Sequence, residues 1–165
     1  MRPLLLAACL IGLPACAMAS RNAFTPQIVG CNSGAPTAYT FQFGTYEKVT
    51  DDLVHFHFGI GIKDKGTMSG VCTGITLPVI PSASELAAER SPGVDEGSCN
   101  IYWHFDITLD VGFCTLIAFI GPDDVQAFVY EQGPNVTSDN LPISALGPNT
   151  MIYGDCWYNT DKNAY

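Results

Sequence analysis

The sequence predicts a single all-β domain, an antiparallel β-barrel or sandwich stapled by disulfide bonds. Three observations support this fold class. Apolar and polar residues alternate in short runs, Gly, Pro and Asp gather in turns between those runs, and several cysteines follow an export signal. The hydrophobic fraction of 47% is enough to fill the core of one domain of this length.

The first residues have the pattern of a signal peptide. Arg2 is followed by an apolar run at residues 4–13 and by Ala-Met-Ala at residues 17–19, where cleavage would occur. The run is shorter than the ~20 residues that span a membrane. We therefore expect a signal peptide at residues 1–19 and one secreted, extracellular domain at residues 20–165, with no membrane contact after cleavage. The alternative is a bacterial protein with a lipid anchor on Cys16.

The predicted strands cover residues 39–43, 53–62, 100–109, 113–120 and 125–130. Residues 67–73 are expected to return from the turn at 64–66 as a hairpin arm, and residues 113–120 are apolar enough to be buried on both faces. In residues 100–109, alternation places Trp103 and Phe105 on the inner face with Ile101, and His104 on the polar face. Residues 81–97 form a polar excursion with one short helical turn, and residues 133–149 form a long loop.

Five cysteines remain after cleavage: Cys31, Cys72, Cys99, Cys114 and Cys156. Export places them in an oxidising compartment, so we expect two disulfide bonds and one cysteine that is either free or bonded to another molecule. No CxxC pair occurs, which gives zinc-ribbon and thioredoxin-like proteins no support. Asn135 begins an Asn-Val-Thr glycosylation sequence.

The net charge of −9 excludes polyanionic partners. A chain this acidic repels nucleic acid and anionic lipid head groups.

The three histidines are candidate metal ligands. His55 and His57 are two residues apart in a predicted strand and share a face, while His104 lies on the polar face of another strand with Asp106 beside it. If the strands are neighbours, these groups could bind zinc or copper in a secreted metal-dependent enzyme. The alternative is a solvated sheet face with no metal or cofactor, and this is the interpretation we adopt.

No catalytic motif is convincing, so the sequence predicts a protein that is not an enzyme. Residues 66–70 read GxxSG and not the GxSxG of a nucleophile elbow. Gly59 and Gly61 lie within a strand and lack the helix that a phosphate-binding loop needs. A set of aromatic residues is a candidate surface for a flat ligand or a glycan: Tyr102, Tyr130, Tyr153, Trp157 and Tyr158.

The region from Cys31 to Cys114 resembles the fungal secreted β-barrel family typified by the major Alternaria allergen, which also contains plant-defence elicitors. Two blocks carry the resemblance, FGIGIKDKGTMSGVC at residues 58–72 and GSCNIYWHFDI at residues 97–107, together with an early cysteine, Cys31, before Tyr39.

The resemblance implies the disulfide bonds Cys72–Cys99 and Cys114–Cys156 and a homodimer bonded through Cys31. It also implies a fungal effector, elicitor or allergen-like function, that is, a binding module whose partner is a host protein or a small aromatic ligand.

Overall fold

The structure, a computed structural model, describes residues 21–160 apart from positions 32–33, 35, 51–52, 80–96, 121–125 and 135. The elements in this part of the chain are β1 (Asn22–Phe24), β2 (Ile28–Gly30), β3 (Ala38–Lys48), β4 (Leu53–Asp64), β5 (Thr73–Thr76), β6 (Gly97–Ile107), β7 (Thr115–Ile120), β8 (Gln126–Gly133), β9 (Val136–Asn140), the 3-10 helix η1 (Ile143–Ala145) and β10 (Leu146–Asn159). The chain is nearly all antiparallel β, which confirms the predicted fold class.

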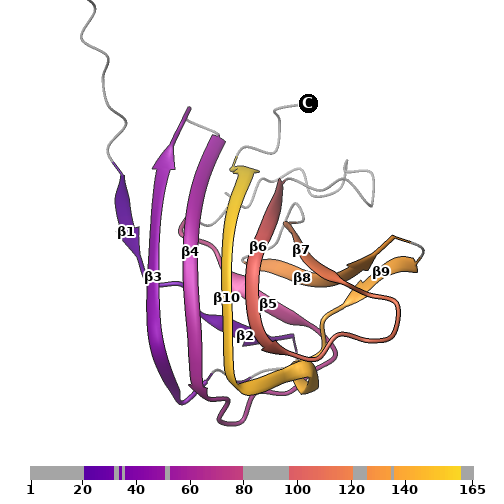
Figure 1. The fold of residues 1–165 in the computed structure, drawn as a ribbon. Helices are drawn as coiled ribbons and strands as arrows, with labels where there is room; N and C mark the ends of the chain where they lie inside the picture. Colours follow the sequence, from indigo (N-terminus) through magenta and orange to yellow (C-terminus); the bar gives the residue numbers. More distant parts are fainter. Residues whose placement is uncertain are drawn as a thin grey trace, which may run out of the picture.

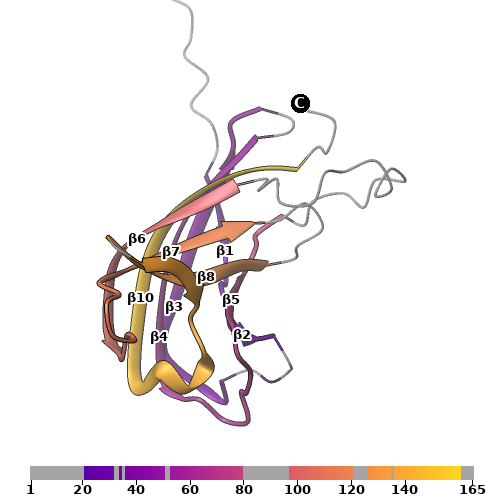
Figure 2. The ribbon, with the colours of Figure 1, turned by 90° about the vertical axis from the view of Figure 1, so that its right-hand side faces the viewer.

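The strands form one curled sheet that closes part of the way around a barrel (Figure 1). Their order is β1-β3-β4-β10-β6-β7-β8-β5-β2, with β9 beside β8. The edge strands β1 and β2 are separated in sequence only by residues 25–27, so the chain passes directly from one edge of the sheet to the other. Seen from the side, β3, β4 and β10 form one wall, and β5 and β2 lie across from it (Figure 2).

The inner face of the curled sheet holds the hydrophobic core. Strand β4 contributes every second residue, and these side chains are fully buried: Val54, Phe56, Phe58, Ile60 and Ile62. Each such side chain stabilises the fold by roughly 1.5–3 kcal/mol relative to an exposed position. Because successive side chains of a strand point to opposite faces, the residues between them lie on the outer face.

The five predicted strands correspond to β3, β4, β6, β7 and β8, but three other predictions are wrong. Strand β4 pairs with β3 and β10, so residues 67–73 are not its hairpin arm. Burial alternates along β7, so that strand is not buried on both faces. The predicted loop at residues 133–149 contains β9, η1 and the start of β10, which lies near the centre of the sheet.

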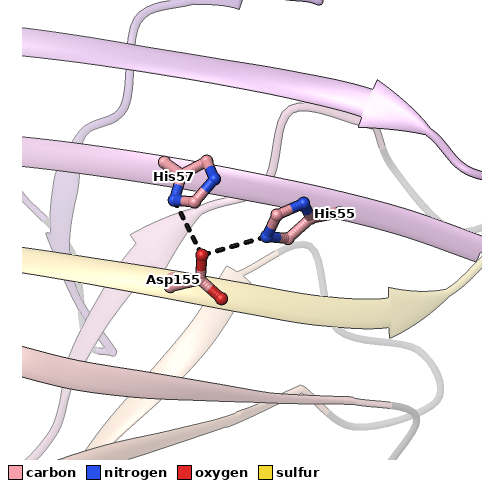
Figure 3. A group of neighbouring side chains, drawn as sticks. All are labelled: His55, His57 and Asp155. Carbon is pink, nitrogen blue, oxygen red and sulfur yellow. Dashed lines mark hydrogen bonds and ion pairs between the residues drawn. The ribbon is translucent and has the colours of Figure 1, made fainter. Parts of the chain in front are cut away.

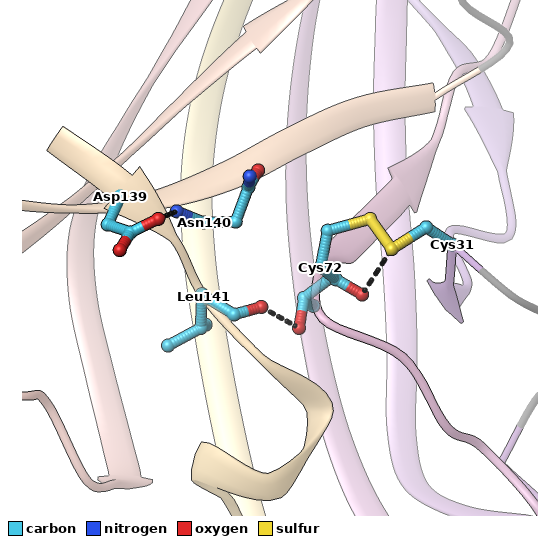
Figure 4. Close-up of a disulfide and its surroundings, with 6 residues drawn as sticks. Cys31, Cys72, Asp139, Asn140 and Leu141 are labelled. Atoms are coloured by element: carbon cyan, nitrogen blue, oxygen red, sulfur yellow. Dashed lines mark hydrogen bonds between the residues drawn. A yellow bond between two sulfur atoms is a disulfide. The ribbon is translucent and has the colours of Figure 1, made fainter.

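The disulfide bonds are Cys31–Cys72 and Cys99–Cys156, so the pairing implied by the resemblance is wrong. Cys99 and Cys156 lie directly opposite each other in the register of β6 and β10. Cys31 and Cys72 flank the paired strands β2 and β5, and the Cys31 amide donates to the Cys72 carbonyl at 3.3 Å. Figure 4 shows the disulfide bond between them. Cys31 is therefore bonded within its own chain and not across a dimer, and Cys114 is an exposed free thiol.

The two bonds close loops of 41 and 57 residues. In the chain-entropy description each stabilises the fold by about 4 kcal/mol. Two disulfides fit a protein that folds in an oxidising compartment. Within the described residues, no helix is long and apolar enough to cross a membrane.

Several predictions concern residues outside those that the structure describes. They are the signal peptide at residues 1–19, the alternative lipid anchor on Cys16, the excursion after residue 80 and the glycosylation site at Asn135.

Candidate ligand-binding face

The outer face of the four strands β3, β4, β10 and β6 is divided into an aromatic half and a polar half. Residues directly opposite each other in an antiparallel pair share a face. The register therefore gives four rows across the strands: Glu47, His55, Trp157 and Ser98; Thr45, His57, Asp155 and Asn100; Phe43, Gly59, Tyr153 and Trp103; Phe41, Gly61, Met151 and Phe105. The first two rows are mainly polar and the last two mainly aromatic.

We call the aromatic half the aromatic face, which comprises Phe41, Phe43, Tyr102, Trp103, Phe105 and Tyr153. Tyr153 lies at its centre, with ring centroids 5.5 Å from Phe41, 5.8 Å from Phe43, 6.5 Å from Tyr102 and 5.1 Å from Trp103. Four of the six side chains are about half exposed: Phe43 (50%), Tyr102 (58%), Trp103 (45%) and Phe105 (53%). Tyr102, Trp103 and Tyr153 line an open pocket of about 240 Å³.

Two glycines of β4 give the rings room to lie flat on the sheet. A Cβ atom at Gly59 would lie 2.4 Å from the ring of Phe43, and one at Gly61 would lie 2.5 Å from the ring of Phe41. Any larger residue at either position would therefore displace a ring. Gly59 and Gly61 do not belong to a phosphate-binding loop. They lie directly beneath the rings of Phe43 and Phe41, and we call them the floor of the aromatic face.

A β-bulge in β6 places Trp103 and Phe105 on the outer face. Ile101 pairs with Gly154 and Trp103 pairs with Tyr153, so Tyr102 is the extra residue between them. An extra residue reverses the alternation of a strand. Ile101 accordingly points into the core at 3% exposure, and the prediction that Trp103 and Phe105 share its face is wrong.

The polar half contains a group of four side chains that we call the histidine cluster: Glu47, His55, His57 and Asp155. His55 and His57 come from β4, and Asp155 faces both from β10 (Figure 3). Asp155 Oδ2 lies 2.9 Å from His55 Nε2 and 2.7 Å from His57 Nδ1. Glu47 Oε1 lies 3.2 Å from the other ring nitrogen of His55, Nδ1. Trp157 stacks on the His55 ring at a centroid distance of 4.0 Å and fixes its plane.

His104 does not join this cluster, so the three histidines considered as alternative metal ligands do not converge. It pairs with Ile152, which is fully buried, and therefore lies on the inner face. Burial lowers the pKa of His104. Its predicted neighbour Asp106 has a structural function, because its carboxylate accepts the amide hydrogen of Asn149 at 2.8 Å.

The aromatic residues named from the sequence lie in four different environments. Tyr102 and Tyr153 belong to the aromatic face, and Trp157 covers His55. Tyr130 packs edge-on against Phe119 at 5.5 Å, away from that face. Tyr158 is 1% exposed and belongs to the core.

Comparison with known proteins gives evidence on the fold alone. No family model matches the chain, and no curated protein matches it. The chain is similar to part of a solved structure, the Dettilon tailspike protein (gp208), with a TM-score of 0.63 and 17% sequence identity over 86% of this chain. It spans 24% of the length of that tailspike.

Proposed function

We propose that this protein is an extracellular binding module that recognises a neutral glycan by stacking sugar rings on the aromatic face. The observation that carries the proposal is the gathering of six aromatic side chains, with Tyr153 at their centre, on the solvent side of the sheet. A contiguous exposed apolar surface on a soluble domain marks a site of interaction. Aromatic rings supply contact area with little loss of side-chain entropy on binding.

The shape of the surface favours a ligand that lies on it over one that is enclosed. The pocket beside Tyr153 has a volume of about 240 Å³. Sites that enclose a drug-sized molecule measure roughly 300–1,000 Å³. A small aromatic ligand would therefore remain largely exposed here, whereas an oligosaccharide can extend over several rings in succession.

The adjoining row of polar side chains favours a glycan over a purely apolar partner. Thr45, His57, Asp155 and Asn100 lie beside the row of Phe43, Tyr153 and Trp103. Sugars present C–H faces for stacking and hydroxyl groups for hydrogen bonds on the same molecule. An apolar partner covering both halves would leave buried polar groups without hydrogen bonds, which is unfavourable.

The charge of the chain selects against other ligands that stack on aromatic rings. Single-stranded nucleic acids also stack on such surfaces, but they need a positively charged groove. The net charge of −9 opposes them and opposes acidic polysaccharides as well. The proposal does not depend on the resemblance to allergens and elicitors, whose implied disulfide pairing differs from the one in this fold.

Affinity electrophoresis tests the proposal directly. Native gels containing soluble neutral polysaccharides, such as glucans, mannans, xylans and galactans, should retard the wild-type protein for at least one polymer. Trp103→Ala should lower the affinity for that polymer at least tenfold, since central aromatic residues each contribute about 1–2 kcal/mol or more to binding. Trp103→Phe, which keeps a ring, should retain much of the retardation. Val71→Ala, at an apolar site that is 71% exposed elsewhere on the surface, should behave as the wild type.

Two results would contradict the proposal. One is the absence of retardation by every polymer. The other is a wild-type dimer that Trp103→Ala dissociates in analytical ultracentrifugation, because the aromatic face would then be a contact between two copies of the chain.

A further inference from the structure

The geometry of the histidine cluster points to a second site, and we propose that His55, His57 and Asp155 bind a zinc ion. The candidate ligand atoms of these three residues all lie within 4.8 Å of one another. A tetrahedral zinc ion with bonds of about 2.0–2.1 Å holds its ligand atoms about 3.4 Å apart. The contacts of 2.7 and 2.9 Å at Asp155 Oδ2 therefore need to lengthen by only about 0.5–0.7 Å to admit the ion.

The hydrogen-bonding capacity of the cluster explains why a cation fits it. Carboxylate oxygens only accept hydrogen bonds. His55 contacts a carboxylate through each of its ring nitrogens, so without a metal it satisfies both only as a doubly protonated imidazolium. With a metal, the neutral ring keeps its Nδ1 hydrogen bond to Glu47 and offers the Nε2 lone pair as a ligand. His57 Nδ1 and Asp155 Oδ2 complete the set.

Glu47 and Trp157 have the positions of groups that orient a metal ligand. A histidine ligand commonly donates its second N–H to a carboxylate, which fixes the tautomer and the ring orientation. Glu47 accepts from His55 at 3.2 Å, and Trp157 stacks on the same ring at an interplanar angle of 14°. The His55 side chain is only 12% exposed, so contacts with neighbouring side chains fix the position of its ring.

The donor set selects the class of metal. Two imidazoles and one carboxylate suit zinc and related transition metals, whereas calcium and magnesium prefer oxygen ligands throughout. Two carboxylates, Glu47 and Asp155, make the cluster attractive to a cation. His57 and Asp155 are 38% and 28% exposed, so the fourth coordination position opens to solvent and would hold water.

Isothermal titration of the untagged mature protein, freed of metal by a chelator, tests the site. We expect one zinc ion per chain, a rise in melting temperature with zinc and no rise with magnesium. His57→Ala and Asp155→Asn should each weaken zinc binding at least a hundredfold or abolish it. Glu47→Ala should weaken it 10- to 100-fold, the usual effect of removing a carboxylate that orients a ligand.

Three controls separate this site from other metal-binding groups. His104→Ala removes the histidine of the opposite face, Cys114→Ser removes the free thiol, and Arg21→Ala removes the other charged partner of Glu47. All three should bind zinc as the wild type does. Cobalt in place of zinc should give the visible absorption of a tetrahedral ion in the wild type and not in Asp155→Asn.

The proposal is overturned if His57→Ala and Asp155→Asn, folded by circular dichroism, bind zinc as tightly as the wild type. It is also overturned if the wild type shows no saturable binding. Neither measurement uses a glycan, so the outcome is independent of the function proposed for the aromatic face.

Discussion

Replacing Gly59 by alanine probes how the aromatic face is built. The added Cβ atom would lie 2.4 Å from the Cε1 and Cζ atoms of Phe43 and 2.9 Å from Cε1 of Tyr153. Carbon atoms in favourable contact are about 3.5–4.0 Å apart. The Phe43 ring must therefore leave its place beside Tyr153, and it is free to do so because it is 50% exposed.

The expected effect on stability is small, because two contributions offset each other. Alanine is more favourable than glycine within a strand by about 0.5–1 kcal/mol. The lost contact between Phe43 and Tyr153 contributes about 0.5–1.5 kcal/mol. The free energy of unfolding of Gly59→Ala should therefore lie within about 1 kcal/mol of the wild-type value, while its affinity for the retained polysaccharide falls several-fold.

Gly97→Ala is the matched comparison. Here the added Cβ would lie 2.2 Å from the main-chain oxygen of Trp157 and 2.6 Å from the Cα of Tyr158, atoms that cannot rotate away. We expect a loss of about 2–3 kcal/mol or more, typical of severe overpacking. Urea unfolding measures both variants. Equal losses of stability, or wild-type polysaccharide binding by Gly59→Ala, would refute the assignment of Gly59 as the floor beneath a movable ring.

Three further predictions test other parts of the fold. Burial raises the pKa of Glu131, whose Oε1 has no hydrogen-bond partner among the described residues. The folded state therefore holds the Glu131 proton more tightly than the unfolded chain does, and stability falls as the pH rises through the folded pKa. Urea unfolding of Glu131→Gln should show higher stability at neutral pH and a weaker decline from acidic pH, and an identical decline in both proteins would contradict this. Tyr158→Phe removes a hydroxyl that donates to the Val79 carbonyl at 2.7 Å and accepts from the Val79 amide at 3.2 Å. This substitution should lower the free energy of unfolding by about 1–3 kcal/mol. A change near zero would show that water replaces these hydrogen bonds. Alkylation of the native, unreduced protein produced without residues 1–19, followed by peptide mapping, should label Cys114 alone, and label on Cys31 or Cys99 would contradict the disulfide pairing.

The sequence predicts β4 well because its alternation of apolar and polar residues is compatible with only one orientation of the strand relative to the core. Large apolar side chains occupy every second position of residues 53–62, and all of them point into the core. The same alternation correctly places His55 and His57 together on the other face. Asp155 could not be found in this way, because it lies 100 residues from His55 in sequence and reaches it only through the pairing of β4 with β10.

Strand β6 shows why alternation alone can fail. Aromatic residues occur at the consecutive positions Tyr102 and Trp103, so the pattern does not reveal which faces the core. The bulge at Tyr102 decides this, and it depends on the register with β10. The Cys99–Cys156 bond depends on that same register, which the sequence of neither strand contains.

Strand β10 was missed because small and polar residues obscure its pattern. The inner face carries Ile152, Gly154, Cys156 and Tyr158, and glycine is a residue type depleted in strands. A Cβ atom at Gly154 would lie 2.5 Å from the Phe58 ring, so the glycine is required by the large side chain opposite it. The compensation between a large residue on one strand and a small one on its neighbour appears only once the strands are paired.

The most direct test of the glycan-binding face is the fluorescence of Trp103. The chain has two tryptophans, so Trp157→Phe leaves Trp103 as the single emitter and keeps an aromatic ring over His55. A neutral polysaccharide that retards this variant in native gels should shift the Trp103 emission to shorter wavelength and protect it from quenching by acrylamide. Retardation with unchanged emission and unchanged quenching would show that the glycan binds elsewhere and would contradict the function proposed for the aromatic face.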